Sequence, residues 1–283
     1  LGQIVRDVSE RQDAEVELTE QETAHLMNHL AGLTLMEAEK ILTKAVVEDG
    51  RLAPDDIEHI ARHKRAIVEQ DGLLEYYPVE ASLSDVADLR GFKGWLAQRT
   101  AVVRDPVRAR KMGLPFPKGV LLMGVPGCGK SLSAKATASE WQMPLLRLDP
   151  SVLYNKYIGE TEKNFRRAMR TAERMAPVVL WIDEIEKAFS AGGETDGGVS
   201  QRLLGSFLAW LQKRQGDVFV IATANDVQRL PPELIRKGRF DELFFVDLPD
   251  AETRQEIFRI HLRTRERDPD GFALDELVQQ TDG

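Results

Sequence analysis

Residues 124–131 read Gly-Val-Pro-Gly-Cys-Gly-Lys-Ser and fit the phosphate-binding pattern G-x-x-x-x-G-K-[ST] at every fixed position. The apolar run at 119–123 is typical of a strand buried on both faces of a parallel sheet. Residues 131–141 have the composition of a helix. Glycines let successive backbone N–H groups turn toward a phosphate, and the helix that follows adds the positive end of its dipole. The sequence therefore predicts a phosphate-binding loop between a strand and a helix.

The side chains of this loop predict contacts with a nucleotide. Lys130 is expected to reach the β and γ phosphates, and the Ser131 hydroxyl is expected to ligate Mg²⁺. A glycine-rich turn can match the pattern by chance, but the flanking strand and helix favour the functional interpretation. The residues expected to contact the nucleotide here are Pro126, Gly127, Cys128, Gly129, Lys130, Ser131 and Leu132.

Composition excludes several classes of protein. The 283 residues can form one large or two modest domains. No apolar run reaches eighteen residues and no charged-then-apolar leader is present, so we expect neither a membrane span nor secretion. The single cysteine excludes an internal disulfide and predicts a reducing compartment such as the cytoplasm. Net charge is −8, with 8 Lys and Arg against 18 Asp and Glu in residues 1–80, so binding to nucleic acid is not indicated.

Residues 1–80 are predicted to form a small all-helical region. The pairs Thr19/Glu22 and Thr34/Glu37 fit the capping box, so helices should begin near 19 and 34. A third helix should begin after Pro54. Four histidines form two i,i+4 pairs that could hold zinc, but no cysteine accompanies them, and we favour surface histidines. These pairs are His25/His29 and His59/His63.

The rest of the chain predicts an α/β fold. A connector at 76–117 is followed by apolar runs that alternate with helical segments, which is typical of a doubly wound parallel sheet. Five strands are expected, at 119–123, 144–148, 177–182, 218–223 and 242–246. The predicted domains are a helical region at 1–80, a core at 81–249 and a helical segment at 250–283.

Polar residues follow the third and fourth of these strands, where ligands bind in such sheets. Asp183 is placed to hold hydrated Mg²⁺, and Glu184 to polarise a water for attack on a γ phosphate. Stabilisation of a helix start is the alternative for these acids. Asn225 could orient the same water, or could be an ordinary loop residue.

Two arginines follow the fourth strand at a spacing of three. Arg236 and Arg239 could be solubilising residues of a surface loop. Alternatively, they are finger arginines presented to the phosphates held by a neighbouring subunit.

Residues 84–283 resemble an AAA ATPase of the AAA+ superfamily. The resemblance rests on five ordered motifs, KGVLLMGVPGCGKS, KYIGETEKNFRRA, VVLWIDEIEKAF, ATAND and RKGRF. Within the family, LLRLDPSVLYNKYIGETE and WIDEIEKAFS are most similar to AAA proteins first named as hypothetical reading frames of algal plastids and cyanobacteria. A plastid-encoded member would lie in the stroma.

The resemblance implies a P-loop NTPase fold with ATP and Mg²⁺ as cofactors. Residues 127–131 would be Walker A, Asp183 and Glu184 Walker B, and Asn225 sensor 1. Arg236 and Arg239 would act on the adjacent protomer of a ring, usually a hexamer.

The resemblance also implies contacts outside the catalytic motifs. Val86 and Ala87 would offer backbone contacts to the adenine base. Tyr157 would lie on the loop that grips polypeptide in ring translocases, although a packed core tyrosine is the alternative.

Two departures from the family pattern affect the expected function. Trp210-Leu211 replaces the Asp-Gly intersubunit signal, and the helical lid that starts at Pro249 is incomplete at residue 283. The segment HLAGLTLMEAEKIL resembles the continuation of such a lid, so residues 1–75 are expected to be the lid of a preceding, degenerate AAA-like domain.

Two classes of function are compatible with these expectations. The first is ATP hydrolysis coupled to remodelling or translocation of a protein partner. The second is an ATP-gated scaffold or regulatory assembly with little threading activity. A P-loop kinase is disfavoured because Asn225 and the arginine pair are ordered for hydrolysis in a ring.

Overall fold

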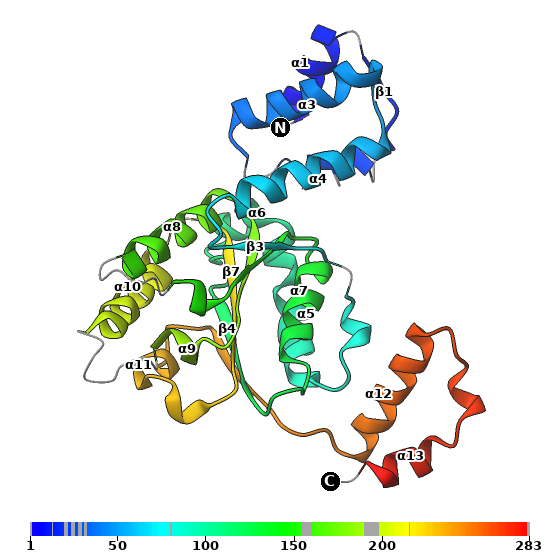
Figure 1. Cartoon of the computed structure of the whole chain (residues 1–283), viewed down its shortest axis with the longest axis vertical. Coiled ribbons are helices and arrows are strands. Elements are labelled where there is room, and N and C mark those ends of the chain that lie inside the picture. Colours follow the sequence, from blue (N-terminus) through cyan, green and yellow to red (C-terminus); the bar gives the residue numbers. More distant parts are fainter. Residues whose placement is uncertain are drawn as a thin grey trace.

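The computed structural model describes the whole chain except residues 1, 13, 20, 21, 24, 25, 28, 29, 31, 32, 80, 154–159, 190–197, 215, 282 and 283. A sheet with helices on both faces forms the centre of the molecule (Figure 1). N-terminal helices lie at one end, and a pair of C-terminal helices extends away from the sheet at the other. Tyr157, His25 and His29 lie outside the described residues.

The N-terminal helices pack around their own apolar core. They are α1 (Gly2–Gln12), α3 (Leu35–Asp49) and α4 (Pro54–Glu69). Thr34 and Glu37 form the predicted capping box of α3, and α4 begins at the predicted proline. The prediction of an all-helical region was wrong in one respect, because β1 (Glu15–Val16) and β2 (Arg51–Leu52) pair in parallel. These strands have two residues each, which is too short to leave a sequence pattern.

The N-terminal helices continue into the core of the sheet domain. Val68 at the end of α4, with Leu73 and Leu74 after it, belongs to the apolar cluster that covers one face of the large sheet. On the surface, Glu37 pairs with Arg174 at 3.2 Å. The N-terminal helices therefore contact the sheet domain through both apolar and charged groups.

The large sheet has six strands in the order β3-β5-β6-β7-β4-β8. Five are parallel and correspond to the predicted ones, so the expected doubly wound fold is confirmed. The sixth, β3, pairs antiparallel with β5 at the edge and was not predicted, because its three residues lie in a segment that resembles a connector. The strands are β3 (Glu75–Tyr77), β4 (Gly119–Gly124), β5 (Leu145–Leu148), β6 (Val178–Ile182), β7 (Val218–Ala224) and β8 (Glu242–Val246).

Helices cover the two faces of this sheet with separate apolar clusters (Figure 1). One face carries α5 and α7, and the opposite face carries α8 and α10. The remaining helices are short and border the sheet. The bounds are α5 (Arg90–Arg104), α6 (Pro106–Lys111), α7 (Lys130–Glu140), α8 (Glu160–Arg174), α9 (Glu186–Phe189), α10 (Val199–Lys213) and α11 (Pro232–Ile235), with 3-10 turns η1 (Leu83–Asp85), η2 (Pro150–Leu153) and η3 (Val227–Arg229).

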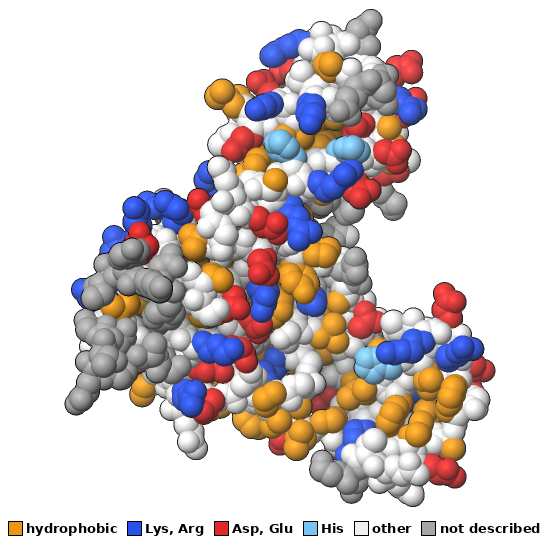
Figure 2. Space-filling view, viewed as in Figure 1, with side chains coloured by type: hydrophobic (Ala, Val, Ile, Leu, Met, Phe, Trp, Pro, Cys, Tyr) orange, Lys and Arg blue, Asp and Glu red, His pale blue; other side chains and the backbone are white. Residues whose placement is uncertain are grey.

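The C-terminal helices follow β8 after an extended segment. They are α12 (Ala251–Thr264) and α13 (Leu274–Gln280), with η4 (Pro269–Gly271) between them. No residue of α12 is buried, and hydrophobic side chains gather on this part of the surface (Figure 2). The backbone N–H of Asp88 donates to Glu256 Oε2 at 3.4 Å and connects α12 to the segment after η1. Across the described ranges, no helix combines the length and apolar character needed to span a membrane.

Candidate active site

The predicted phosphate loop lies where expected, between β4 and the first residue of α7. Gly127 and Gly129 have φ values of 83° and 85°, a left-handed conformation that disfavours side chains with a Cβ. Pro126 and Gly127 are exposed, while Cys128, Gly129, Ser131 and Leu132 are half-buried. The loop thus combines an accessible tip with the N-terminus of an eleven-residue helix, the arrangement that binds anions.

Lys130 lies along this loop in the structure. Its Nζ donates to the carbonyl oxygens of Gly124 at 2.8 Å and Val125 at 2.7 Å. Burial lowers the pKa of the Lys130 amine, while the nearby acids Glu186, Asp183 and Glu184 oppose that shift.

The two acids at the end of β6 are held by Thr223 of β7. The Thr223 hydroxyl donates to Asp183 Oδ1 at 2.9 Å and accepts the backbone N–H of Glu184 at 3.1 Å. Glu184 has a φ of 49°, which is uncommon for a residue with a side chain. Thr223 was not predicted as a site residue, because it is buried within an apolar strand and only its hydroxyl distinguishes it there.

Asn225 and Glu184 contact one another directly. Asn225 Nδ2 donates to Glu184 Oε1 at 2.7 Å, and the backbone N–H of Asn225 donates to Glu186 Oε1 at 2.9 Å. The other oxygen of Glu184, Oε2, pairs with Lys187. The structure therefore brings together the predicted acid and the predicted amide from two neighbouring strands.

Arg147 also reaches this group and was missed from the sequence. Its Nη2 donates to Asp183 Oδ2 at 3.0 Å, so each Asp183 oxygen has one partner. In the sequence, an arginine inside the run LLRL has no feature that marks it as a site residue. Only the order of the strands in the sheet places it beside Asp183.

Arg236 and Arg239 lie after α11, with Arg236 exposed and Arg239 half-buried. Among the described residues, neither guanidinium forms an ion pair with the acids after β6. Within one chain, the structure does not bring these arginines into the group formed by Asp183, Glu184 and Asn225.

The segment predicted to contact the base directly follows η1, which contacts α7. Val86 is buried and its carbonyl oxygen accepts from Lys93 Nζ, while Ala87 is half-buried. Asp88 and Leu89 follow with φ values of 55° and 53°, so the chain turns sharply here. The segment is therefore near the helix that begins at the phosphate loop.

The donor chemistry of the site fits Mg²⁺. The Ser131 hydroxyl and the Asp183 carboxylate supply oxygen atoms, and Mg²⁺ bound with a nucleotide uses few protein ligands. Within the part of the chain that the structure describes, no group of three or more His, Cys, Asp or Glu could hold a metal ion. His59 and His63 are exposed on α4, in agreement with the surface interpretation.

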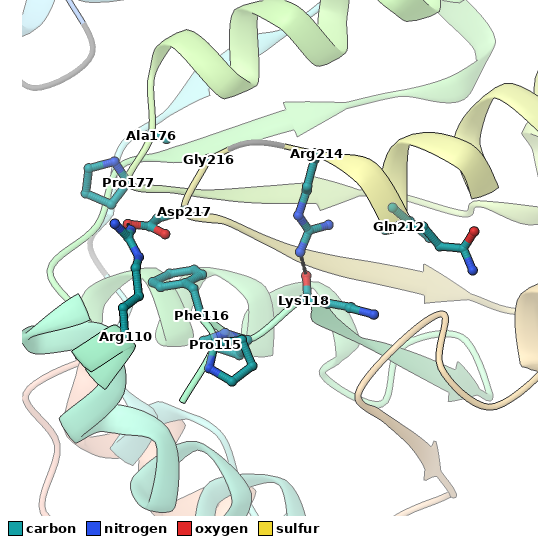
Figure 3. A pocket seen from close by; sticks show the side chains of 12 residues that line it. Arg110, Pro115, Phe116, Lys118, Ala176, Pro177, Gln212, Arg214, Gly216 and Asp217 are labelled. Carbon is teal, nitrogen blue, oxygen red and sulfur yellow. Dashed lines mark hydrogen bonds and ion pairs between the residues drawn. The ribbon is translucent and has the colours of Figure 1, made fainter. Parts of the chain in front are cut away.

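A separate cavity of about 640 Å³ lies at the opposite ends of the parallel strands (Figure 3). Arg110 pairs there with Asp217, and Arg214 donates to the carbonyl oxygen of Lys118. Burial lowers the pKa of Arg214 to about 10. The polar residues predicted for nucleotide binding are absent from the lining of this cavity, so we do not assign it to the nucleotide.

Comparison with known families identifies the class to which this site belongs. Residues 120–248 match the family described as ATPase family associated with various cellular activities (AAA). Residues 1–71 match the family described as SpoVK-like AAA ATPase, second domain. The chain belongs to the AAA ATPases, and the resemblance inferred from its motifs is confirmed.

Three individual AAA proteins show how far the similarity extends along this chain. The chain is 41% identical over 247 residues to the uncharacterized AAA domain-containing protein ycf46 of Guillardia theta, covering 87% of this chain and 48% of that protein. The protein of the same name from Pyropia yezoensis is 42% identical over 248 residues, with coverage of 87% and 50%. A cell division cycle protein 48 homolog of Archaeoglobus fulgidus is 35% identical over 213 residues, with coverage of 72% and 29%. The chain thus spans about half the length of the two ycf46 relatives.

Proposed function

We propose that this chain catalyses Mg²⁺-dependent hydrolysis of the β–γ phosphoanhydride of ATP. The observation that carries the proposal is the hydrogen bond between Asn225 Nδ2 and Glu184 Oε1, 2.7 Å long, at the ends of the strands beside the phosphate loop. It joins a carboxylate that can accept a proton to an amide that can orient water. The membership of residues 120–248 in the AAA family supports the same reaction.

In this proposal the phosphate loop binds the nucleotide. Backbone N–H groups of residues 127–132 contact the phosphates, Pro126 borders them at the tip of the loop, and Lys130 exchanges its carbonyl acceptors for β and γ oxygens. Ser131 and Asp183 hold Mg²⁺, which neutralises charge on the phosphate oxygens when bound. Val86 and Ala87 contact the adenine base through their backbone.

Glu184 acts as the general base in this mechanism. Its Oε1 accepts a proton from water as the water oxygen attacks the γ phosphorus, and ADP leaves with the β–γ bridging oxygen. Asn225 restrains the carboxylate and offers its amide to the water. Lys187 pairs with Oε2 of Glu184, whereas Asn225 donates to Oε1, so the two oxygens have different partners.

We propose that the active unit is a ring, with Arg236 and Arg239 acting on ATP bound by the adjacent protomer. The exposure of Arg236, and the absence among the described residues of an ion pair between it and Asp183 or Glu184, support action between subunits. We propose a homo-oligomer that is hexameric when active. The ATPase rate per subunit should then rise with protein concentration, and Arg239→Ala should remove that rise without changing nucleotide binding.

We propose that hydrolysis remodels or translocates a protein partner, and Tyr157 is the residue proposed to grip it. Tyr157→Ala should abolish remodelling while ATP turnover remains. The second candidate is an ATP-gated scaffold. It is favoured by Trp210, which stands in place of the intersubunit signal and instead donates to Glu173 at 3.0 Å within its own chain.

We also propose three functional parts and a compartment. Residues 81–249 are the ATPase core, 250–283 the start of its lid, and 1–80 a helical region that includes the lid of a preceding AAA-like domain at 1–75. The match of residues 1–71 to a second-domain AAA family supports the last assignment. One free cysteine is compatible with the cytoplasm, or with the stroma if the protein is plastid-encoded.

The decisive experiment is Glu184→Gln in the full chain. The substitution keeps the hydrogen-bonding oxygen for Asn225 but removes the base. ATP binding should be retained and steady-state phosphate release should fall by at least about 100-fold. Unchanged phosphate release would refute the assignment of Glu184, and a product other than ADP and phosphate would refute hydrolysis.

A further inference from the structure

The register of the large sheet places Arg147 between two acids. Arg147 on β5 lies directly opposite Glu75 of β3 and, on its other side, opposite Trp181 of β6. Cross-strand partners present their side chains on the same face, and Asp183 follows Trp181 by two residues on that face. The arginine therefore reaches from the antiparallel edge strand to the end of β6.

Glu75 and Asp183 use separate nitrogens of this guanidinium, and a third carboxylate, Asp149 Oδ2, lies 3.9 Å from Nη2. Nη1 lies 3.1 Å from Glu75 Oε2, and Nη2 lies 3.0 Å from Asp183 Oδ2. The Arg147 Cζ atom is 5.1 Å from the centre of the Trp181 ring, which supports the guanidinium from one side. The side chains of Arg147 and Asp183 are 24% and 19% exposed, so solvent screens their interaction only in part.

Asp183 does not depend on Arg147 for its orientation. Its Oδ1 accepts the Thr223 hydroxyl at 2.9 Å, and its backbone N–H donates to Leu148 O at 3.2 Å. The principal effect of Arg147 on this carboxylate is therefore a positive charge placed on Oδ2. A divalent cation that approaches Asp183 meets that charge.

We propose that Arg147 competes with the divalent cation for Asp183, and that Glu75 weakens the competition by holding the other side of the guanidinium. Arg147 is then a positioning residue that sets the affinity of the site for Mg²⁺. This inference rests on the proposed role of Asp183 as a metal ligand.

The ion pair between Glu75 and Arg147 also connects the proposed metal site to the N-terminal helices. Glu75 belongs to β3, and the backbone N–H of the next residue, Tyr76, donates to Glu69 Oε1 of α4 at 3.1 Å. A shift of α4 relative to the sheet would move Glu75 and redistribute the guanidinium between the two acids.

The test measures binding of a fluorescent ADP analogue to the full chain over a series of Mg²⁺ concentrations at fixed ionic strength. Arg147→Gln should lower the Mg²⁺ concentration for half-maximal binding by about three- to tenfold, because it removes the competing charge. Glu75→Gln should raise that Mg²⁺ concentration by about twofold. The effect is smaller because the pair between Glu75 and Arg147 is more exposed than the pair between Arg147 and Asp183. The double variant should behave like Arg147→Gln alone, and binding in EDTA should be unchanged in all three.

Two further variants serve as controls. Arg147→Lys keeps the charge and should stay within about twofold of the wild type. Arg167→Gln removes an arginine that pairs with Asp71 at 3.4 Å, away from the site, and should equal the wild type. If Arg147→Gln fails to fold, Glu75→Gln still decides the question, because the Glu75 side chain is 55% exposed.

The outcomes distinguish this inference from the proposed function. Mg²⁺ dependence that survives Asp183→Asn would refute the metal role of Asp183 itself. Asp183→Asn abolishes the Mg²⁺ dependence if Asp183 is a metal ligand. If Arg147→Gln then leaves the Mg²⁺ concentration for half-maximal binding unchanged or raises it, only the inference on Arg147 is overturned. An effect of Glu75→Gln in the same direction as Arg147→Gln would also overturn it.

Discussion

The side-chain amide of Asn225 donates to Glu184 Oε1 over 2.7 Å, joining the ends of β7 and β6. The backbone N–H of the same asparagine donates to Glu186 Oε1 at 2.9 Å, so its position is fixed from two sides. This geometry lets the amide restrain the Glu184 carboxylate.

Asn225→Ala should therefore lower kcat by about 10- to 100-fold with little change in KM, because the carboxylate loses its restraint in the transition state. Steady-state phosphate release over a series of ATP concentrations measures both constants. Asn225→Asp provides a size-matched comparison and should be equally impaired, since two carboxylates would repel. A raised KM with unchanged kcat would instead assign Asn225 to nucleotide binding.

Thr223→Val should affect stability as well as turnover. The substitution keeps the shape but leaves Asp183 Oδ1 and the Glu184 N–H without their shared partner. We expect the free energy of unfolding to fall by about 1 to 3 kcal/mol, measured by urea denaturation, and ATP turnover to fall with it. Thr223→Ser keeps the hydroxyl and should retain most of both. Equal behaviour of the two variants would contradict this role of the hydroxyl.

Gly119→Ala should disrupt the pairing of β4 with β7. A Cβ at Gly119 would lie 2.1 Å from Val220 O, and the φ of +153° is rarely adopted by residues with side chains. Backbone must shift to relieve that contact, so we expect a loss of about 3 kcal/mol or more, or failure to fold. Gly94→Ala is the matched control: it lies in α5 with nothing within 4 Å and should be stabilising by up to about 1 kcal/mol. Similar thermal unfolding of both variants would contradict the argument.

Acidification should weaken the contact between α3 and α8. Burial alone would raise the pKa of Glu37, but hydrogen bonds from Thr34 and the Arg174 guanidinium outweigh it and hold that pKa below its ordinary value. A carboxylate with a lowered pKa in the folded state stabilises the fold above its unfolded pKa, and this contribution is lost as pH falls through the folded pKa.

Urea unfolding at pH 6 and pH 3.5 measures this contribution. Glu37→Gln should lose less stability over that range than the wild type, by about 0.5 to 1 kcal/mol. Glu39→Gln, on the same helix, should follow the wild type. An identical pH dependence for Glu37→Gln and the wild type would show that the hydrogen bonds from Thr34 and the pair with Arg174 together add nothing.

The residues predicted from sequence were those whose role follows from their own segment. Asp183 and Glu184 were identified because a continuous apolar strand ends at them, and Asn225 because it follows the next strand. Thr223 and Arg147 could not be identified in this way. Their roles depend on which strands are neighbours, and no local pattern within VFVIATA or LLRL encodes that order.

By itself, the sequence determined the phosphate loop at 124–131 and the five parallel strands, because glycine spacing and apolar runs act over short distances along the chain. Only the tertiary structure decided that β3 adds a sixth, antiparallel strand, and that Glu75, Arg147 and Asp183 form one charged row across three strands. The physical reason is that strand register is set by packing between segments far apart in sequence. Residues 124–131 are therefore specified by their own local sequence, whereas the charges around Asp183 are a property of the assembled sheet.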